Sequence, residues 1–443
     1  PAPCEKECRR AEVDSAIAIR DLKRFAADQV DLSELPLPEI EDRPEKIAVI
    51  GSGPAGLTVA YYMRLKGYAV TIFEALGQAG GMLRVGIPDY RLPPEVLDNE
   101  INFILKHGIE IKAGVRFGSD LSLEGLRQDG FAAIFLGIGA HAAIRMNIPG
   151  EDHAAGVIDA LAFLREVNLG KGEVPGKLVI VIGGGNVAID AARVAKRQGA
   201  ETVTVVYRRS EREMPAYPEE LQGAREEGIE FSYLTAPVSI HCQGGKVTGF
   251  ECIRTELGPP DASGRRRPVP VEGSEFVITC DAVIPAIGQK IDIPWSAVEP
   301  DLKLTSRNTF TVNPHTFQTS IPDVFAAGDA VTGPATVIEA VADGHKVVAA
   351  MHRFISGEDL DQYAAERVAE EPPQTDWQAI PEKIENTPRV VSEHLDPAQR
   401  AKNFDEVDKN FSEAAARQEA ARCVDCGGCC ECKLCVDACE AKA

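Results

Sequence analysis

The sequence lacks a long uninterrupted hydrophobic run. No uncharged apolar segment approaches the roughly 18 residues that a membrane-spanning helix needs, and no segment resembles a secretory signal. Positive charge is also scarce, because 47 Lys and Arg residues face 68 Asp and Glu residues and the formal net charge is -21. Binding to nucleic acid needs clustered basic side chains. We therefore expect a cytoplasmic protein with neither a membrane nor a nucleic acid as partner.

Cysteine is scarce over most of the chain. Of the 12 cysteines, only Cys242, Cys252 and Cys280 occupy the long middle, and we expect these three to be buried structural residues. The others cluster near the two ends. A secreted disulfide scaffold spreads its bridges through a small chain, so this clustering favours metal ligation in a reducing compartment.

A glycine-rich turn follows the apolar strand expected at 47–50. In the run Gly51-x-Gly53-x-x-Gly56 the first glycine permits a tight turn, the second lets a pyrophosphate approach the backbone, and the third lets helix and strand pack closely. Glu74 ends the next strand, where an acid accepts ribose hydroxyls. The alternative is an unliganded turn. We predict a dinucleotide site here, formed by Gly51, Ser52, Gly53, Pro54, Ala55, Gly56 and Glu74.

Two further segments indicate which dinucleotide this first site binds. One is the glycine-rich loop at 80–90, and the other is the run at 323–329 that precedes a helix beginning near Thr336. Both resemble two-dinucleotide flavoproteins, in which the equivalent of Asp329 holds the ribityl chain and phosphate end of FAD and the helix start faces the flavin pyrimidine ring. A second NAD site does not explain these segments. The FAD contacts predicted here are Gly81, Met82, Leu83, Arg84, Ile87, Gly328, Asp329, Thr336 and Val337.

A second glycine-rich turn follows the strand expected at 178–182. The next strand ends in Arg208 and Arg209, where an NAD site usually places an acid, so two guanidiniums favour a 2′-phosphate and NADP(H). Glu211 and Glu213 lie nearby and keep open the alternative of a solvated basic turn that accepts NAD as well. Gly288 lies in a loop that resembles the return crossover between the two domains of such proteins. The predicted contacts are Gly183, Gly184, Gly185, Asn186, Val187, Ala188, Arg208, Arg209 and Gly288.

The C-terminal tail repeats cysteines at the spacing of a bacterial ferredoxin, with Glu440 in place of the usual following proline. One 4Fe-4S cluster takes four thiolates, so the tail offers more ligands than one cluster uses and one or two clusters are expected. Cys430 breaks the pattern, and which thiolate serves which cluster stays open. Zinc also uses CxxC pairs and is the alternative. The predicted ligands in the tail are Cys423, Cys426, Cys429, Cys432, Cys435 and Cys439.

Cys4 and Cys8 form a second, smaller group at the other end, in PAPCEKEC. They are too few to ligate a cluster alone, and in isolation they could be free thiols. We predict them as cluster ligands on the strength of the resemblance described next.

Taken together, several motifs resemble the small-subunit family of glutamate synthase over residues 1 to about 357. The electron-input part of dihydropyrimidine dehydrogenase and the flavoprotein subunit of the bifurcating ferredoxin transhydrogenase are similar. The resemblance implies that the PAPC-type segment ligates a cluster beside FAD. The family's CxxCG segment lies upstream of PAPC, whereas RCVDCG stands here at 422–427, so Cys423 and Cys426 are expected to fold back beside Cys4 and Cys8. The motifs are PAPCEKEC, VIGSGPAGL, GGMLRVGIPDYRLP, VIGGGNVAIDAA, VYRRSEREMP and VFAAGDAVTGPATVIEAVADG.

The predicted fold class is α/β, with two Rossmann-like dinucleotide-binding domains, the NAD(P) domain inserted in the FAD domain, and iron-sulfur segments at both termini. Helices are expected at 14–28, capped by Asp14 or Ser15, and at 411–422. The predicted division is 1–43 for an N-terminal helical segment with cluster ligands and linker, 44–150 and 281–357 for the FAD-binding domain, 151–280 for the NAD(P)-binding domain, 358–410 for an extended linker, and 411–443 for a ferredoxin-like 4Fe-4S segment.

The function implied is electron transfer between NAD(P)H, FAD and 4Fe-4S clusters, in either direction, with no general acid or base. The expected partner is a catalytic subunit in a hetero-oligomer, of the glutamate synthase large-subunit, aldehyde oxidoreductase, hydrogenase or formate dehydrogenase type. One alternative is a stand-alone flavin or disulfide reductase, although neither nucleotide domain holds a CxxC pair that could relay electrons to a disulfide. Another is a scaffold subunit that holds cofactors without catalysis.

Overall fold

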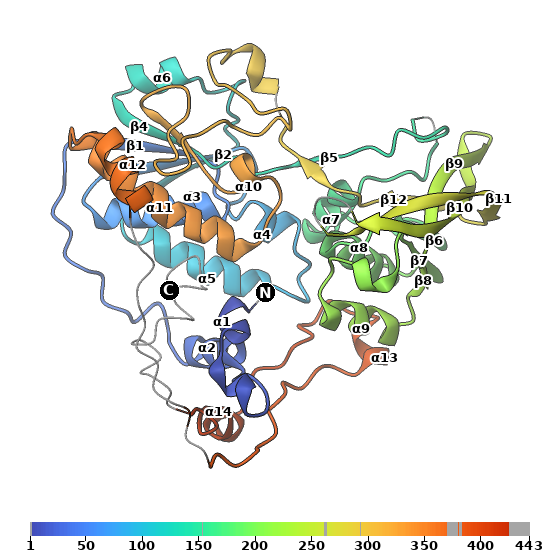
Figure 1. The fold of residues 1–443 in the computed structure, drawn as a ribbon. Helices are drawn as coiled ribbons and strands as arrows, with labels where there is room; N and C mark the ends of the chain where they lie inside the picture. The colour runs from blue at the N-terminus through green and yellow to red at the C-terminus, as the bar shows by residue number, and fades with distance from the viewer. Residues whose placement is uncertain are drawn as a thin grey trace.

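The computed structural model describes residues 2–152, 154–260, 264–292, 294–369, 380 and 383–424. Two α/β lobes lie side by side, and the helices α1, α2 and α14 gather below them (Figure 1). Each lobe is built on its own parallel sheet. The predicted fold class is therefore seen in the arrangement of the strands.

The first lobe is built on a five-stranded parallel sheet of order β14-β4-β1-β2-β3. Its central strand β1 is buried on both faces after Lys46, which agrees with an uninterrupted apolar sequence. The strands are β1 (Lys46–Ile50), β2 (Ala69–Glu74), β3 (Glu110–Ala113), β4 (Phe131–Leu136) and β14 (Val324–Ala326).

Helices α3 and α11 pack closely together against this sheet. A Cβ at Gly344 of α11 would lie 2.8 Å from Thr58 Cβ of α3, so glycine permits the close approach of the two helices. The other face of the sheet packs on an aromatic group that includes Phe117, Trp295 and Phe310. The helices of this lobe are α3 (Pro54–Leu65), α4 (Met82–Val85), α5 (Pro94–Leu105), α6 (Leu123–Gln128), α10 (Asp329–Thr332), α11 (Val337–Ile355) and α12 (Leu360–Ala369), with a 3-10 turn η3 (Pro294–Ala297).

The second lobe contains a four-stranded parallel sheet of order β12-β6-β7-β8. The strands are β6 (Leu178–Ile182), β7 (Thr202–Val206), β8 (Glu230–Ser232) and β12 (Ala282–Pro285). The helices are α7 (Ala160–Asn168), α8 (Asn186–Arg197) and α9 (Pro218–Glu226), with a 3-10 turn η2 (Glu211–Glu213).

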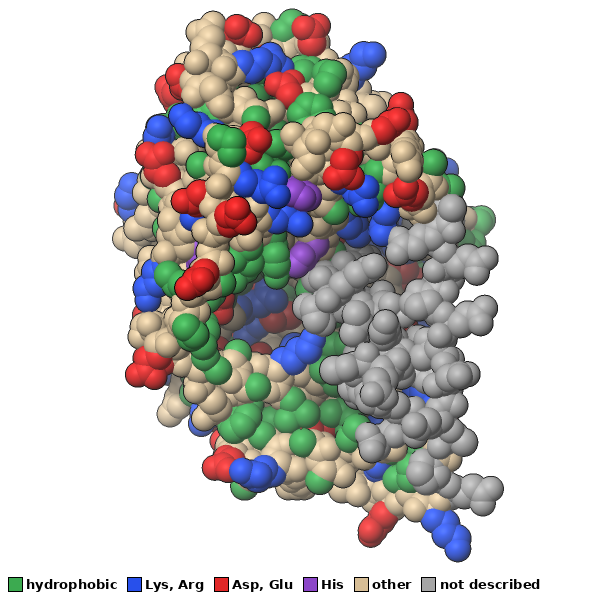
Figure 2. All heavy atoms as spheres, turned by 90° about the vertical axis from the view of Figure 1, so that its left-hand side faces the viewer, with side chains coloured by type: hydrophobic (Ala, Val, Ile, Leu, Met, Phe, Trp, Pro, Cys, Tyr) green, Lys and Arg blue, Asp and Glu red, His purple; other side chains and the backbone are tan. Residues whose placement is uncertain are grey.

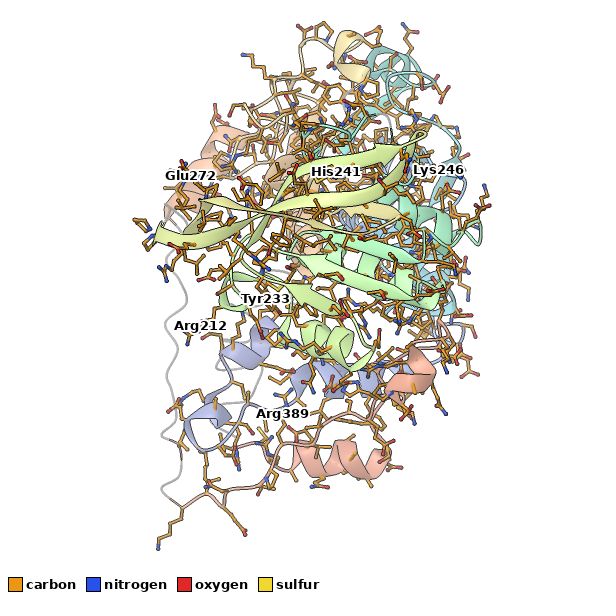
Figure 3. The ribbon with its side chains drawn as sticks, turned by 90° about the vertical axis from the view of Figure 1, so that its right-hand side faces the viewer. Arg212, Tyr233, His241, Lys246, Glu272 and Arg389 are labelled. Carbon is orange, nitrogen blue, oxygen red and sulfur yellow. The ribbon has the colours of Figure 1, made fainter. Side chains whose placement is uncertain are left out.

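An antiparallel sheet of order β11-β10-β9 covers the outer side of the second lobe. Figure 3 looks onto this sheet, with His241 and Lys246 towards one end of it and Glu272 towards the other. Two short strands pair where the chain passes between the lobes, so the outward and return connections lie together. The strands are β9 (Thr235–Gln243), β10 (Lys246–Pro260) and β11 (Arg266–Ile278) in the sheet, and β5 (Ala142–Ala143) and β13 (Gln289–Lys290) in the connections.

The two ends of the described chain pack on each other. Ala18, Phe411 and Ala416 form a small buried cluster between α2 and α14. Helix α14 begins behind Ser412, whose hydroxyl accepts a hydrogen bond from the Ala415 amide. The elements are α1 (Pro3–Lys6), η1 (Arg9–Glu12), α2 (Ile19–Asp28), α13 (Pro397–Arg400) and α14 (Glu413–Ala420).

Three details of the expected organisation differ from the structure. Helix α2 begins later than expected, behind Ala18 and without a side-chain cap, because the Asp14 carboxylate instead accepts hydrogen bonds from Arg10. The stretch expected as an extended linker contains α12, whose Leu360 and Tyr363 join the core of the first lobe. Strand β12 pairs with β6 and so lies in the second sheet, although 281–357 was assigned to the first domain. The domain boundaries otherwise remain predictions.

Candidate functional site

One cavity of ≈ 1090 Å³ reaches both glycine-rich turns. Residues 51–55 of the first lobe and residues 182–187 of the second lobe line it. The crossover segments between the lobes contribute His141 and Gly288. Seen from one side, the molecule is hollowed near its centre, with Lys and Arg side chains inside the hollow (Figure 2). The two predicted nucleotide sites are therefore parts of one continuous space.

The first glycine turn has the geometry that its sequence predicts. A Cβ at Gly56 would lie 1.9 Å from Gly51 O, so the helix start lies against the end of β1. Gly51 has φ +99, and a Cβ there would lie 2.4 Å from Gly137 O. Gly53 differs, because a Cβ at this position would meet no atom within 4 Å. The open side of Gly53 and the N-terminus of α3 therefore form a cradle that suits a pyrophosphate.

Glu74 is nearly enclosed, with 5% of its surface exposed. One carboxylate oxygen accepts hydrogen bonds from the Ser52 amide at 2.9 Å and the Ser52 hydroxyl at 2.5 Å, and the other accepts one from the Leu76 amide at 2.7 Å. Ser52 Oγ also accepts a hydrogen bond from the Gly80 amide. Glu74 thus fixes the glycine turn and the following loop, while it still lines the cavity.

The segment around Asp329 closes the cavity on the side of α11. Asp329 Oδ1 accepts a hydrogen bond from the Ala335 amide at 3.1 Å, and burial raises the pKa of the Asp329 carboxyl to about 6. Thr336 caps α11 in a reciprocal pair with Glu339, each side chain accepting from the other's backbone amide. The N-terminus of this long helix, with Thr336 and Val337, borders the cavity.

The loop after Glu74 contributes most of its predicted contacts to the cavity wall. Gly81, Met82, Leu83 and Ile87 line the cavity. Arg84 does not, because its guanidinium pairs with Asp98 and donates to the Ala79 carbonyl. Gly56, Ala188 and Gly328 also lie outside the lining, behind neighbours that border it. The ligand contacts of all these residues remain predictions.

The second glycine turn repeats the geometry of the first. Gly183 has φ +144, and a Cβ there would lie 2.3 Å from Ala286 O, whereas a Cβ at Gly185 would meet nothing within 4 Å. Asn186 begins α8, and its side-chain oxygen accepts a hydrogen bond from the Tyr217 amide at 3.0 Å. Gly184 packs beside the ring of Tyr207. A second open cradle therefore faces the same cavity.

Arg208 and Arg209 both line the cavity but differ in environment. Arg208 is exposed, and Arg209 is 7% exposed with its Nε donating to the Arg266 carbonyl at 2.7 Å. The two nearby acids are engaged elsewhere. Glu211 pairs with Arg225 at 2.7 Å, and Glu213 caps η2 together with Ser210.

The cavity wall also contains residues that are not among the predicted contacts, such as Arg91, Arg265 and His141. Arg91 forms ion pairs with Asp190 at 2.8 Å and Glu220 at 3.1 Å, and so joins the loop after α4 to the second lobe. Burial, with Arg165 nearby, lowers the pKa of His141. Arg265 is the first of three consecutive arginines, and such a run is the feature of the sequence that could have indicated it as a candidate binding residue.

Some of the cysteines predicted as cluster ligands lie among the residues that the structure describes, and the others lie outside them. Cys4 is buried, Cys8 is half-buried and accepts a hydrogen bond from the Ile17 amide at 3.4 Å, and Cys423 is exposed. Cys426, Cys429, Cys430, Cys432, Cys435 and Cys439 lie outside the described residues. In the part of the chain that is described, no group of three or more His, Cys, Asp and Glu side chains could hold a metal ion.

The expectation for the middle cysteines was wrong at one position. Cys252 and Cys280 are buried, and burial raises the pKa of each thiol to about 12. Cys242 is exposed, because it lies near the end of the edge strand β9.

The sequence of residues 45–344 matches the profile of the family described as pyridine nucleotide-disulphide oxidoreductase. The chain belongs to this family. It is an oxidoreductase whose α/β fold and resemblance to the glutamate synthase small-subunit family are confirmed by the relatives that follow.

Three curated relatives align with most of the chain. The NADP(+)-dependent formate dehydrogenase subunit beta of Moorella thermoacetica is 41% identical over 457 residues, which cover 96% of this chain and 64% of the relative. The NADPH-Fe(3+) oxidoreductase subunit beta of Geobacter sulfurreducens is 40% identical over 462 residues, which cover 96% of this chain and 68% of the relative. The glutamate synthase [NADPH] small chain of Escherichia coli is 37% identical over 361 residues, which cover 77% of this chain and 76% of the relative. The chain thus spans about two thirds of the length of the first two relatives.

Solved structures support the fold. FprA of Mycobacterium tuberculosis in complex with NADPH has a TM-score of 0.62 at 20% identity, covering 74% of this chain and 89% of that one. Thioredoxin reductase of Lactococcus lactis has a TM-score of 0.54 at 21% identity, and the match covers 71% of this chain and 100% of that one. Among the described helices, none combines the length and apolar character that crossing a membrane requires.

Proposed function

We propose that the chain passes electrons between NADPH, FAD and 4Fe-4S clusters, on behalf of a catalytic partner subunit. The observation that carries the proposal is the single cavity lined by both glycine turns, because hydride transfer requires the two reacting rings to be in contact. FAD, when bound, exchanges a hydride with the nicotinamide and single electrons with clusters. The relatives whose names include NADP(H) and a subunit or small chain support this reading.

The first lobe is the proposed FAD site. Gly53 leaves room for the pyrophosphate, and the N-terminus of α3 offers amides that favour its negative charge. Asp329 lies half-buried at the cavity wall, where a carboxyl can bind the ribityl hydroxyls. The start of α11 at Thr336 presents the positive end of a 19-residue helix to the flavin region. These residues bind and orient the group.

The second lobe is the proposed NADPH site. Gly185 leaves room for the second pyrophosphate at the start of α8. Arg208 and Arg209 follow β7 at the position where an acid would recognise a ribose with two free hydroxyls. Glu211 forms an ion pair with Arg225, and Glu213 caps η2 with Ser210. Two guanidiniums at this position favour NADP(H) over NAD(H).

The two cysteine groups are the proposed ligands of one or two 4Fe-4S clusters. Arg10 donates to the Arg422 carbonyl at 2.8 Å, and Arg422 pairs with Asp14 at 2.9 Å. The residue before Cys423 is therefore bound to the segment that follows Cys8, which supports the expected fold-back of the tail. The ferredoxin spacing of the remaining cysteines supports iron and sulfur over zinc.

The proposed assembly is a hetero-oligomer with an iron-sulfur protein or a metalloenzyme. Neither glycine turn nor the crossover holds an acid-base pair suited to an organic substrate, so the electrons need an acceptor elsewhere. We propose a reducing, cytoplasmic setting because clustered thiols are retained there.

Cofactor analysis of the anaerobically purified chain tests this assignment. We expect about one FAD per chain, and about 4 to 8 iron atoms with matching acid-labile sulfide, as one or two clusters require. Zinc without sulfide would contradict the cluster assignment. A protein that takes up no flavin would contradict the assignment of the first lobe.

A further inference from the structure

The hairpin between β10 and β11 carries three consecutive arginines. Arg265 lines the main cavity together with Arg208 and Arg209. Arg267 lines a smaller cavity of ≈ 570 Å³ whose wall again includes Arg208 and Arg209. Each end of the triplet therefore lines a cavity that Arg208 and Arg209 also line, although more than 50 residues separate the triplet from this pair in sequence.

The hairpin is hydrogen-bonded to the turn that holds this pair. Arg209 Nε donates to the Arg266 carbonyl at 2.7 Å. On the opposite strand, the Thr255 hydroxyl donates to the Arg208 carbonyl at 2.8 Å. The hairpin and the arginine turn thus form one unit, and the position of the triplet is fixed relative to the second nucleotide site.

The middle arginine of the triplet holds the two strands of the hairpin together. Arg266 Nε donates to the Gly258 carbonyl at 3.1 Å, and Arg266 Nη2 donates to the Leu257 carbonyl at 2.5 Å. Arg266 therefore closes the hairpin on itself. The outer two, Arg265 and Arg267, are exposed and border the two cavities.

Arg208 and Arg209 border both cavities, with Arg265 at the larger one and Arg267 at the smaller one. Positive side chains gathered in this way attract a multiply charged anion. A phosphate monoester suits the geometry, because guanidinium groups bind phosphate oxygens through paired hydrogen bonds. The site lies beyond the end of β7, where the adenosine ribose is recognised in this type of domain, whereas the pyrophosphate belongs at Gly185. The phosphate that this position fits is the 2′-phosphate.

We propose that Arg265 and Arg267 complete, with Arg208 and Arg209, the binding site for the 2′-phosphate of NADP(H). The inference rests on the proposed function and extends it: the choice between NADP(H) and NAD(H) depends on the β10–β11 hairpin as well as on the β7 turn.

Calorimetric titration of the flavin-loaded protein with NADP⁺, NAD⁺ and adenosine 2′,5′-bisphosphate tests the proposal. The double variant Arg265→Gln/Arg267→Gln is compared with Arg307→Gln, which removes an exposed arginine outside both cavities. We expect the double variant to bind NADP⁺ and the bisphosphate at least about tenfold more weakly, because charged hydrogen bonds are lost. Its affinity for NAD⁺ should change less than twofold. Arg307→Gln should change none of the three affinities.

The remaining outcomes of these titrations would contradict either the role of the hairpin or the proposed function. Equal weakening of NADP⁺ and NAD⁺ would overturn the proposal, and so would unchanged NADP⁺ binding. If NADP⁺ binding is unchanged in the hairpin variant but falls in Arg208→Gln/Arg209→Gln, the hairpin claim fails while the proposed function stands. If the wild type binds neither nucleotide, the proposed function fails as well. Should the double variant misfold, the single variants Arg265→Gln and Arg267→Gln replace it, and we expect each to bind NADP⁺ more weakly than the wild type with NAD⁺ affinity changed less than twofold; unchanged NADP⁺ affinity in both would overturn the proposal.

Discussion

Gly53 and Gly185 hold equivalent positions in the two turns, and both have extended backbone that any residue can adopt. A Cβ at either position would enter open space rather than the protein. Substitution at these positions should therefore leave the fold intact and obstruct only a ligand. The two sites can be separated in this way.

Replacing Gly53 with Val should abolish flavin binding, because the branched side chain fills the pyrophosphate cradle. Replacing Gly185 with Val should leave a yellow protein whose affinity for NADP⁺ falls about tenfold or more, since such overpacking costs about 1–3 kcal/mol. The flavin absorption spectrum and an NADP⁺ titration measure the two effects, and each variant is the control for the other. Equal loss of flavin in both variants would show that the division of the sites is wrong.

The raised pKa of Asp329 predicts that the free energy of unfolding depends on pH. Burial raises the pKa of its carboxyl from 3.8 to about 6, so the folded protein holds the proton more tightly than the unfolded chain. Its contribution to the free energy of unfolding therefore falls as the pH rises from 3.8 to about 6 and is constant above that.

The variant Asp329→Asn lacks this titration. Relative to wild type it should gain stability between pH 4 and pH 7, by up to about 3 kcal/mol at about 1.4 kcal/mol per pKa unit. Denaturant unfolding of both proteins over that range measures the difference. A difference that does not vary with pH would contradict the assignment.

Single residues could be predicted from the sequence where their role is local. The glycine turns are examples, because a tight turn and an open cradle depend on a few consecutive residues. Arg265 could not be placed, because its position depends on a hairpin that pairs with a distant turn. Cys242 was misplaced because edge-strand exposure is set by the order of strands in a sheet, which its own neighbours do not encode.

Among the secondary-structure elements, α14 and α2 show how the chain ends are joined. Arg422 follows α14 and is almost fully buried, with its guanidinium paired to Glu419 at 2.7 Å and to Asp14 at 2.9 Å. Glu419 in turn accepts hydrogen bonds from the Ala18 amide at 2.8 Å and the Val390 amide at 2.8 Å. This buried network holds the start of the cysteine tail against the N-terminal segment.

Replacing Arg422 with Ala should release this junction, because it leaves the Glu419 carboxylate buried without its cation. We expect faster hydrogen exchange at Ala18 and Val390 and a lower iron content. Arg417 lies in α14 with an exposed side chain, and Arg417→Ala is the matched control. Unchanged exchange and iron content in Arg422→Ala would show that the junction does not position the cysteines.

The parallel strands and their helices followed from apolar runs and glycine turns, and α14 followed from its composition. The start of α2 could not be predicted, because Asp14 forms ion pairs with Arg10 and with Arg422, and Arg422 is far away in sequence. Helix α12 was missed because its contacts with the first lobe, through Leu360 and Tyr363, are few and are not periodic enough to stand out.

The whole molecule depends on a junction between its lobes. Tyr90 is fully buried in the core of the second lobe, with the guanidiniums of Arg193 and Arg197 over its ring at 4.7 and 4.0 Å. The Val407 amide donates to the Tyr90 carbonyl at 3.0 Å, so the segment after α13 also binds this loop. These contacts hold the two cradles at one cavity. The two-lobe plan was predictable from two glycine turns, whereas this junction was not, because it is built from polar side chains distant in sequence.

The central claim is that both turns serve one electron path, and anaerobic stopped-flow mixing with NADPH tests it most directly. We predict that NADPH bleaches the flavin absorbance on the timescale of turnover and that the cluster signal then falls with it, more readily than with NADH. Gly185→Val, which keeps its flavin, should need an NADPH concentration about tenfold or more higher to show the same changes. A flavin-loaded wild-type protein that NADPH does not reduce would contradict the account and leave a chain that holds cofactors without passing electrons between them.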